Sequence, residues 1–404
     1  MKMTNSYLIV SSIYANYIMQ SIAVIVIMQF SFAFMYQLNT NLIGLGFVAS
    51  GIGIGKVLMM FVGGVFSDRY GRKPCILMGM ICYTCFFIGL IFCTSISQAF
   101  ILTILAGAGN SFLDTGSMPA LTELFPGSAS SASVLIKGFI SIGTFILPFI
   151  VTITYKYHIW HGYALCFFAF YLIVNTILLA FARFPCKHSI LSGTKRTKSR
   201  HKKEENYFIG TPCLFIEGTC LVMMGFTISA TFVIIMQWLP EIAMHGVGMN
   251  AIAAKQLISD YSMGSIFSVL CTAYIVRMLI KPVYCIILFP LLSALMLGVF
   301  LIDLSPFVCK VVAFVMGFTA AGGVLQLTIV VMQQLFPKRK GIGVGLVYTF
   351  SGLAFMLTPL IIPKLILFDV RYAILFDCLM ALVSMLLGCI VLFRFRQVIN
   401  INKL

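Results

Sequence analysis

Residues 64–76 read Gly-Val-Phe-Ser-Asp-Arg-Tyr-Gly-Arg-Lys-Pro-Cys-Ile and form a short polar segment between two long apolar runs. We expect Gly64 to let a helix end lie close to a neighbouring helix, and Gly71 to permit a tight reversal of the chain. The carboxylate of Asp68 can accept hydrogen bonds from the amides that begin the next helix. The basic residues of the segment then anchor it at the membrane surface: Arg69, Arg72 and Lys73. An ordinary positively charged turn would need these basic residues but neither the aspartate nor the glycines.

The composition excludes a soluble globular protein. Hydrophobic residues make up 61% of the chain, charged residues make up 9%, and the mean hydropathy is +1.06. In soluble domains about a quarter of the residues are charged. Apolar runs of about 20 residues recur along the chain, each long enough to cross a bilayer. They predict twelve spans: 10–37, 41–66, 74–95, 98–123, 129–154, 161–183, 211–239, 251–276, 282–302, 307–335, 341–363 and 370–393. No cleavable signal peptide is evident, so the first span is expected to be retained.

The net charge of +16 indicates membrane topology rather than nucleic-acid binding. With the N-terminus inside, most of the 27 Lys and Arg residues fall on cytoplasmic segments, which is the usual bias of membrane proteins. Five fall on the outer side: Lys156, Lys255, Lys310, Lys364 and Arg371. We therefore expect a multi-pass protein of the cell (inner, cytoplasmic) membrane with both termini in the cytoplasm. Its partners are then the lipid bilayer and a small-molecule substrate, with no nucleic acid, and we expect a monomer.

The segment 64–76 resembles the loop between helices 2 and 3 of the major facilitator superfamily. The pattern of that loop is Gly-x-Leu-(Ala/Ser)-Asp-Arg-x-Gly-Arg-(Arg/Lys), and every marked position agrees except Phe66, where the family prefers Leu. The resemblance implies an all-α membrane protein with twelve transmembrane helices in two pseudo-symmetric six-helix bundles. It also implies transport by alternating access, with the loop helping to hold the inner gate.

The chain divides into two halves around one long polar segment. We expect an N-terminal bundle at 1–184, a basic cytoplasmic linker at 185–210 and a C-terminal bundle at 211–404. A faint internal repeat supports duplication of a six-helix unit. Leu-Phe-Pro at 124–126 precedes Pro148, and Leu-Phe-Pro at 335–337 precedes Pro359 at the same interval.

Charged side chains at membrane depth are the first candidates for a functional site, because they are costly there. Lys56 lies about 18 Å from Asp68 along a helix that rises 1.5 Å per residue. Asp114 lies at a similar depth, Lys137 lies somewhat nearer the inner face, and Asn110 is one turn from Asp114. The resemblance implies that the first and fourth spans line the cavity, which adds Tyr17 and Gln20. The alternative is a structural salt bridge that only holds the first bundle together.

The second half offers weaker candidates. Glu217 and Asp260 are the carboxylates expected to meet the cavity, and either could carry a coupling proton. Gln326 is a further candidate for the cavity. Asp377 lies in the last span, which is usually peripheral, so we expect it to have a packing or interfacial role.

Other motifs do not support enzymatic chemistry. Residues 51–56 read Gly-Ile-Gly-Ile-Gly-Lys, but a phosphate-binding loop needs Gly at Ser50 and Ser or Thr at Val57. Close helix packing is the better account of these glycines and of the similar run at 341–345. No set of metal ligands or nucleophilic triad is visible, and the thirteen cysteines are read as small buried hydrophobes. We expect no enzyme, no metal and no cofactor beyond a coupling ion, for which H⁺ is the candidate.

These observations predict a secondary active transporter. Two lysines and one aspartate at a common depth leave one positive charge, which favours a small polar metabolite, and in particular an organic anion, as the substrate. Efflux of a drug or lipophilic compound, driven by protons, is the alternative. A sensor without transport activity, built on the same fold, is a further one.

Overall fold

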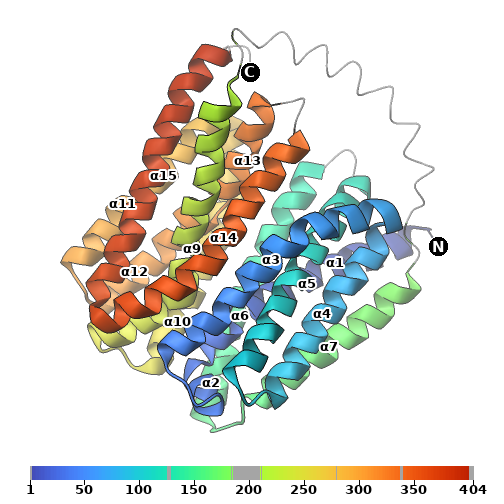
Figure 1. Ribbon diagram of the computed structural model, residues 1–404, viewed down its shortest axis with the longest axis vertical. Helices are drawn as coiled ribbons and strands as arrows, with labels where there is room; N and C mark the ends of the chain where they lie inside the picture. The colour runs from blue at the N-terminus through green and yellow to red at the C-terminus, as the bar shows by residue number, and fades with distance from the viewer. Residues whose placement is uncertain are drawn as a thin grey trace.

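The computed structural model describes residues 2–124, 129–182, 184, 210, 212–278, 280–336 and 340–399. Every regular element within these residues is a helix (Figure 1). The predicted linker at 185–210 lies outside the described residues except for Gly210.

The N-terminal half runs through the blue to green helices of Figure 1. Its helices are α1 (Lys2–Gln29), α2 (Ser31–Gln37), α3 (Leu42–Tyr70), α4 (Arg72–Phe92), α5 (Ile96–Leu124), α6 (Ala129–Lys156) and α7 (Gly162–Phe181). The predicted first span is therefore two helices, since α1 ends before Phe30 and the short α2 follows. We call the end of the molecule that carries α2 the Ser31 end, and the end that carries the turn between α3 and α4 the Gly71 end.

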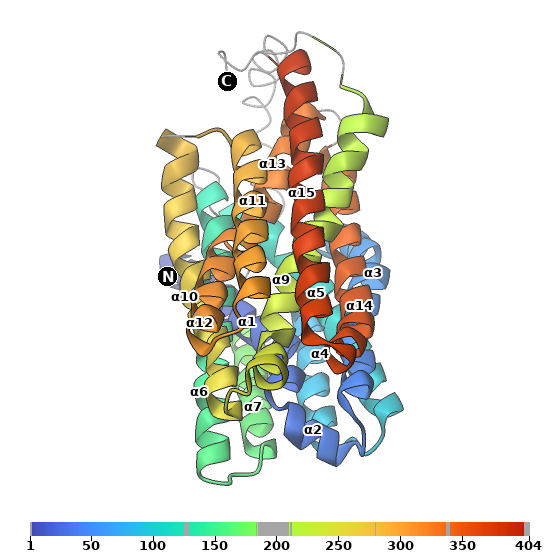
Figure 2. The ribbon, with the colours of Figure 1, turned by 90° about the vertical axis from the view of Figure 1, so that its left-hand side faces the viewer.

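The C-terminal half faces the viewer in Figure 2. Its elements are η4 (Leu214–Gly218), α9 (Thr219–Val247), α10 (Ala251–Met278), α11 (Pro282–Ile302), α12 (Pro306–Met316), η5 (Gly317–Ala321), α13 (Val324–Leu335), α14 (Lys340–Phe368) and α15 (Val370–Val398). Both η elements are single turns of π-helix. The second one interrupts the predicted span 307–335, and Gly323, with a φ of 119°, completes the break.

Eleven helical segments in the described residues are long and apolar enough to cross a membrane. The twelfth segment, α10, falls below this level because it carries Lys255, Asp260 and a series of serines. These polar side chains do not face lipid alone, since α10 packs along α6 of the other half. The two sets of six segments confirm the predicted architecture of two six-helix bundles.

The two halves meet through symmetry-related pairs of helices. The second membrane-crossing segment of the N-terminal half is α3, and it packs against α14, the fifth such segment of the C-terminal half. Conversely, α6 is the fifth of the N-terminal half and packs against α10, the second of the C-terminal half. Glycines allow the first of these contacts. Gly46 lies against Pro359 and Pro363, and Gly53 lies against the backbone of Met356, so an added Cβ would overlap the opposite helix at both positions.

The contact between α6 and α10 is made by hydroxyl groups. Ser141 Oγ lies 2.8 Å from Ser265 Oγ, and Ser262 donates to Thr144 over 2.7 Å. Nearer the Gly71 end, Gly138 has no neighbour within 4 Å of where a Cβ would stand. The contacts that the described residues make between the halves are therefore concentrated towards the Ser31 end.

A buried ion pair closes the Ser31 end. Lys255 of α10 is 2.8 Å from Glu241 of α9, and both side chains are almost fully buried. The lysine also donates to the carbonyl oxygen of Met28 over 2.6 Å, and Ser31 donates to Glu241 over 2.8 Å. Since Met28 and Ser31 belong to the N-terminal half, this ion pair joins the two halves.

The side chain of Lys255 is 0% exposed, because it is paired at the interface between the halves. Two sequence-based expectations are wrong in this structure. Gly64 was expected to lie close to a neighbouring helix, but nothing lies within 4 Å of its Cβ position. The same is true of Gly341 and Gly345, because the halves are apart at the Gly71 end.

The glycine contact gives a first prediction. Gly53→Ala places a methyl group against the Met356 backbone, and overpacking of this kind typically costs about 1–3 kcal/mol. Gly345→Ala is the matched control, since it adds the same methyl group to a helix where there is space. We expect the purified Gly53→Ala protein to melt at a lower temperature than wild type, and Gly345→Ala at the same temperature or higher. Equal melting of the two variants would contradict the observed packing.

The ion pair gives a second prediction. Removing one partner leaves an unpaired buried charge, which typically costs about 3–5 kcal/mol, whereas replacing both by apolar residues can be nearly neutral. We expect Lys255→Met and Glu241→Leu each to lower the melting temperature strongly, and the double variant to recover part of the loss. Lys364→Met, at an exposed lysine of α14, is the control with no expected effect. Losses that simply add in the double variant would show that the two charges do not stabilise each other.

Candidate functional site

The position of Lys56 is fixed by close packing of α3 on α5. Gly55 lies against the Ile104 carbonyl and Gly107 against the Ile52 carbonyl, so neither helix has room for a larger side chain there. Ser111 of α5 also donates to the backbone carbonyl of Lys56 over 2.9 Å. Lys56 is only 7% exposed, and its ammonium group lies 4.9 Å from the centre of the Phe355 ring of α14. Lys56 therefore contacts both halves of the protein.

Asp114 of α5 lies between two lysines. Its carboxylate interacts electrostatically with Lys56 and, less strongly, with Lys137 of α6. Within the described residues, neither lysine comes within the 4.0 Å of a direct salt bridge to it. Asp114 and Lys137 are both partly exposed. The structure thus brings the three predicted charges close together, without a direct salt bridge between them in the described residues.

Polar side chains of α1 and α5 surround the carboxylate of Asp114. The side chains of Gln20 and Tyr17 both make polar interactions with this carboxylate, and Ser117 lies beside the Tyr17 hydroxyl. Several buried polar atoms here have no hydrogen-bond partner among the described residues: Tyr17 Oη, Gln20 Oε1, Ser117 Oγ, Asn110 Oδ1 and Asn16 Nδ2. Each unpaired buried group typically costs about 1–3 kcal/mol. A polar ligand or water molecules at this position would offset that cost.

The C-terminal half contributes to the same region through α14. Tyr348 interacts electrostatically with Asp114 and Tyr17, and the ring of Phe355 lies against the Lys56 ammonium. We call Lys56, Asp114 and Lys137 with Tyr17, Gln20 and Tyr348 the central cluster. Tyr348 and Phe355 were missed by the sequence analysis, because aromatic residues in an apolar span give no signal of the face on which they lie.

The other candidates of the second half lie elsewhere. Glu217 is paired with Arg394 at 3.0 Å, near the Gly71 end. Asp260 interacts with Lys310 of α12, within the C-terminal half. Gln326 follows the helix break at Gly323, and its Oε1 has no hydrogen-bond partner among the described residues. A role for these three residues in binding or coupling stays a prediction.

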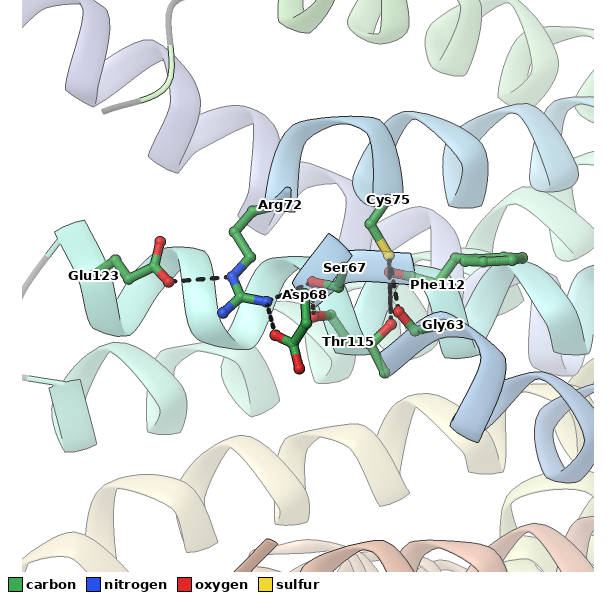
Figure 3. A network of polar contacts seen from close by, with 8 residues as sticks. All are labelled: Gly63, Ser67, Asp68, Arg72, Cys75, Phe112, Thr115 and Glu123. Carbon is green, nitrogen blue, oxygen red and sulfur yellow. Dashed lines mark hydrogen bonds and ion pairs between the residues drawn. The ribbon is translucent and has the colours of Figure 1, made fainter. Parts of the chain in front are cut away.

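The turn between α3 and α4 ties together the ends of the N-terminal helices at the Gly71 end (Figure 3). Arg72 donates to Asp68 and Ser67, both over 2.8 Å, and to Glu123 of α5 over 3.1 Å. Gly71 has a φ of 98°, which confirms the tight reversal expected from the sequence. Two further basic residues lie in the turn: Lys73 donates to the Ala180 and Ala182 carbonyls at the end of α7, and Arg69 lies over the Tyr70 ring. In this conformation the turn therefore stabilises the N-terminal half.

Comparisons with known proteins agree with this architecture. Residues 7–341 match the family model of the Major Facilitator Superfamily. The chain is 37% identical over 357 residues to YfkL of Bacillus subtilis, described as an uncharacterised MFS-type transporter; the match covers 88% of both chains. It is 33% identical over 396 residues to YdiN of Escherichia coli, described as an inner membrane transport protein, covering 98% of this chain and 92% of that one.

A solved structure supports the fold independently of sequence. The crystal structure of a D-xylose-proton symporter superposes with a TM-score of 0.76 at 13% sequence identity, covering 95% of this chain and 97% of that chain. At so low an identity the likeness concerns the fold alone. The signature turn, the paired six-helix bundles and the match of the family model to residues 7–341 lead to one conclusion: this protein is a multi-pass membrane transporter that belongs to the major facilitator superfamily.

Proposed function

We propose that the protein is a secondary active transporter that moves a small polar metabolite carrying an anionic group, and that it does so by alternating access with proton coupling. The observation that carries the substrate class is the central cluster. Two lysines interact electrostatically with one aspartate there, so one positive charge has no negative counterpart within the cluster. An unpaired cation at membrane depth is expensive. An anionic group bound between the lysines would neutralise it, and the unpaired amide and hydroxyl groups would bind the rest of a polar molecule.

The proposed orientation places the Gly71 end in the cytoplasm, as the distribution of Lys and Arg favours. The conformation described above then faces inwards, with its contacts between the halves concentrated on the outer side. Closing the Gly71 end would require the Ser31 end to open. Lys255 and Glu241 both belong to the C-terminal half, so they can stay paired when it opens. The hydrogen bonds lost are those to Met28 and Ser31, which water can replace, and a difference of a few kcal/mol between the two states suffices to shift their populations.

The orientation is tested by thiol labelling. We expect a cysteine introduced into the 185–210 segment of a background without its own reactive cysteines to resist a membrane-impermeant reagent in intact cells. A cysteine at Lys310, which is exposed near the Ser31 end, should react. The opposite pattern would invert the topology.

The substrate class is tested by Lys137→Ala in proteoliposomes. The probes are radiolabelled lactate, succinate, citrate, gluconate and inorganic phosphate, with the lipophilic cation tetraphenylphosphonium for the efflux alternative. Loss of a charged hydrogen bond is worth about 1.5–3 kcal/mol, so we expect anion uptake to fall roughly 10- to 100-fold. Lys137→Arg should retain part of it, because the positive charge persists.

The matched control is Lys364→Ala, which removes an exposed lysine from α14 and should transport like wild type. Wild-type anion uptake by Lys137→Ala would contradict an anion site at the central cluster. Movement of tetraphenylphosphonium alone would instead favour the efflux function, with Asp114 as the counter-charge.

A further inference from the structure

A second buried carboxylate lies inside the C-terminal half, away from the central cluster. Asp377 of α15 is 0% exposed, and α15 packs against α9 and α11. Neither of its carboxylate oxygens has a hydrogen-bond partner among the described residues. The sequence analysis assigned this residue to packing or an interfacial position, but a packing role does not explain a polar group that is buried without a partner.

Within the part of the chain that the structure describes, no positive charge compensates Asp377. The titratable groups that interact with it within the described residues are Tyr261 of α10 and the neighbouring Cys378, both of which are neutral in their usual form. The helices packed against α15 present no Lys, Arg or His to this carboxylate within the same residues. An isolated ionised carboxylate is among the most costly groups to bury, so the neutral, protonated form is the one that this environment accepts.

One hydroxyl group interacts with Asp377 within the described residues. It belongs to Thr231 of α9, which also donates a hydrogen bond to the Thr227 carbonyl over 3.1 Å. A metal ion would require several oxygen ligands, so a single hydroxyl group does not make this carboxyl group a metal site.

A small cavity adjoins the same threonine. It has a volume of about 10 Å³, lies inside the C-terminal half and is lined by Thr231, Ser293, Thr319 and Ser384 together with apolar residues. Ser384 lies two turns beyond Asp377 on α15, towards the Gly71 end, and donates to the Thr227 hydroxyl over 2.6 Å. The π-helical turn η5 forms another part of the cavity wall through Thr319, and such turns are frequent at functional sites.

We propose that Asp377 is an exchangeable proton-binding site and that, on the basis of the proposed function, its proton is the one moved with the substrate. The carboxylate takes a proton from water when the Ser31 end is open, and it is buried as the neutral acid in the state described here. It returns the proton to water that enters along Thr231 and Ser384. The step forms one O–H bond on Asp377 and breaks the same bond on release, so each cycle moves one proton.

Infrared difference spectroscopy of the full chain in proteoliposomes tests the site without any substrate. We expect wild type to show the carbonyl band of a protonated carboxylic acid near neutral pH, and to lose that band on alkaline titration. Asp377→Asn should lack it. Asp303→Asn, which makes the same substitution at an exposed acid of the same half, should retain it. Thr231→Val should keep the band, because the carboxyl group stays buried and without a charged partner.

Two results would overturn the site: a band that survives unchanged in Asp377→Asn, or a wild-type band that Na⁺ abolishes at constant pH. Both spectroscopic results can be obtained even if no probe anion is transported. The proton-binding site is therefore tested separately from the proposed function. For any probe that wild type accumulates, Asp377→Asn should still exchange it across the membrane but should lose accumulation driven by a pH gradient. Undiminished accumulation in that variant would show that Asp377 is not the coupling group.

Discussion

Each charged side chain inside the membrane-spanning helices has to be compensated by the protein itself, because hydrocarbon offers neither water nor counter-ions. The chain meets this constraint in three different ways. Glu241 and Lys255 neutralise each other at the interface between the halves. The central cluster leaves a positive charge that a ligand can neutralise, and Asp377 has no charged partner in the described residues at all. The degree of compensation therefore separates a structural pair from the two groups assigned to binding.

The arrangement of helices makes these charges responsive to conformation. In each half the second helix packs against the fifth helix of the other half, so the two interfaces are related by the pseudo-symmetry of the fold. Lys56 lies on one interface, over Phe355 of α14, and Lys137 belongs to α6, which forms the other interface with α10. A solute bound between them would lie between helices of both interfaces. Closure of either end can therefore be linked to occupancy of the same central position.

The sequence was sufficient for the fold because its signals are local. The polar turn at 64–76 and the twelve apolar runs depend on residues close together in the chain, and depth along a helix placed Lys56 and Asp114 near each other. The predictions of side-chain partners failed, because these partners depend on the rotation of each helix and on residues far away in the sequence. The pairing of Lys255 with Glu241 and the pairing of Glu217 with Arg394 were therefore not predicted. The isolation of Asp377 is a property of its neighbours on other helices, which no local pattern records.

The empty glycine positions at the Gly71 end gain a meaning from helix register. Gly53 of α3 lies against Met356 of the antiparallel α14. Eleven residues further along α3 is Gly64, and eleven residues back along α14 is Gly345, so these two glycines stand level with each other across the gap. Neither has a neighbour here, although glycine within a helix costs roughly 0.5–1 kcal/mol relative to alanine. The closure proposed above would bring these two glycine positions together, and their conformational cost is already present in this structure.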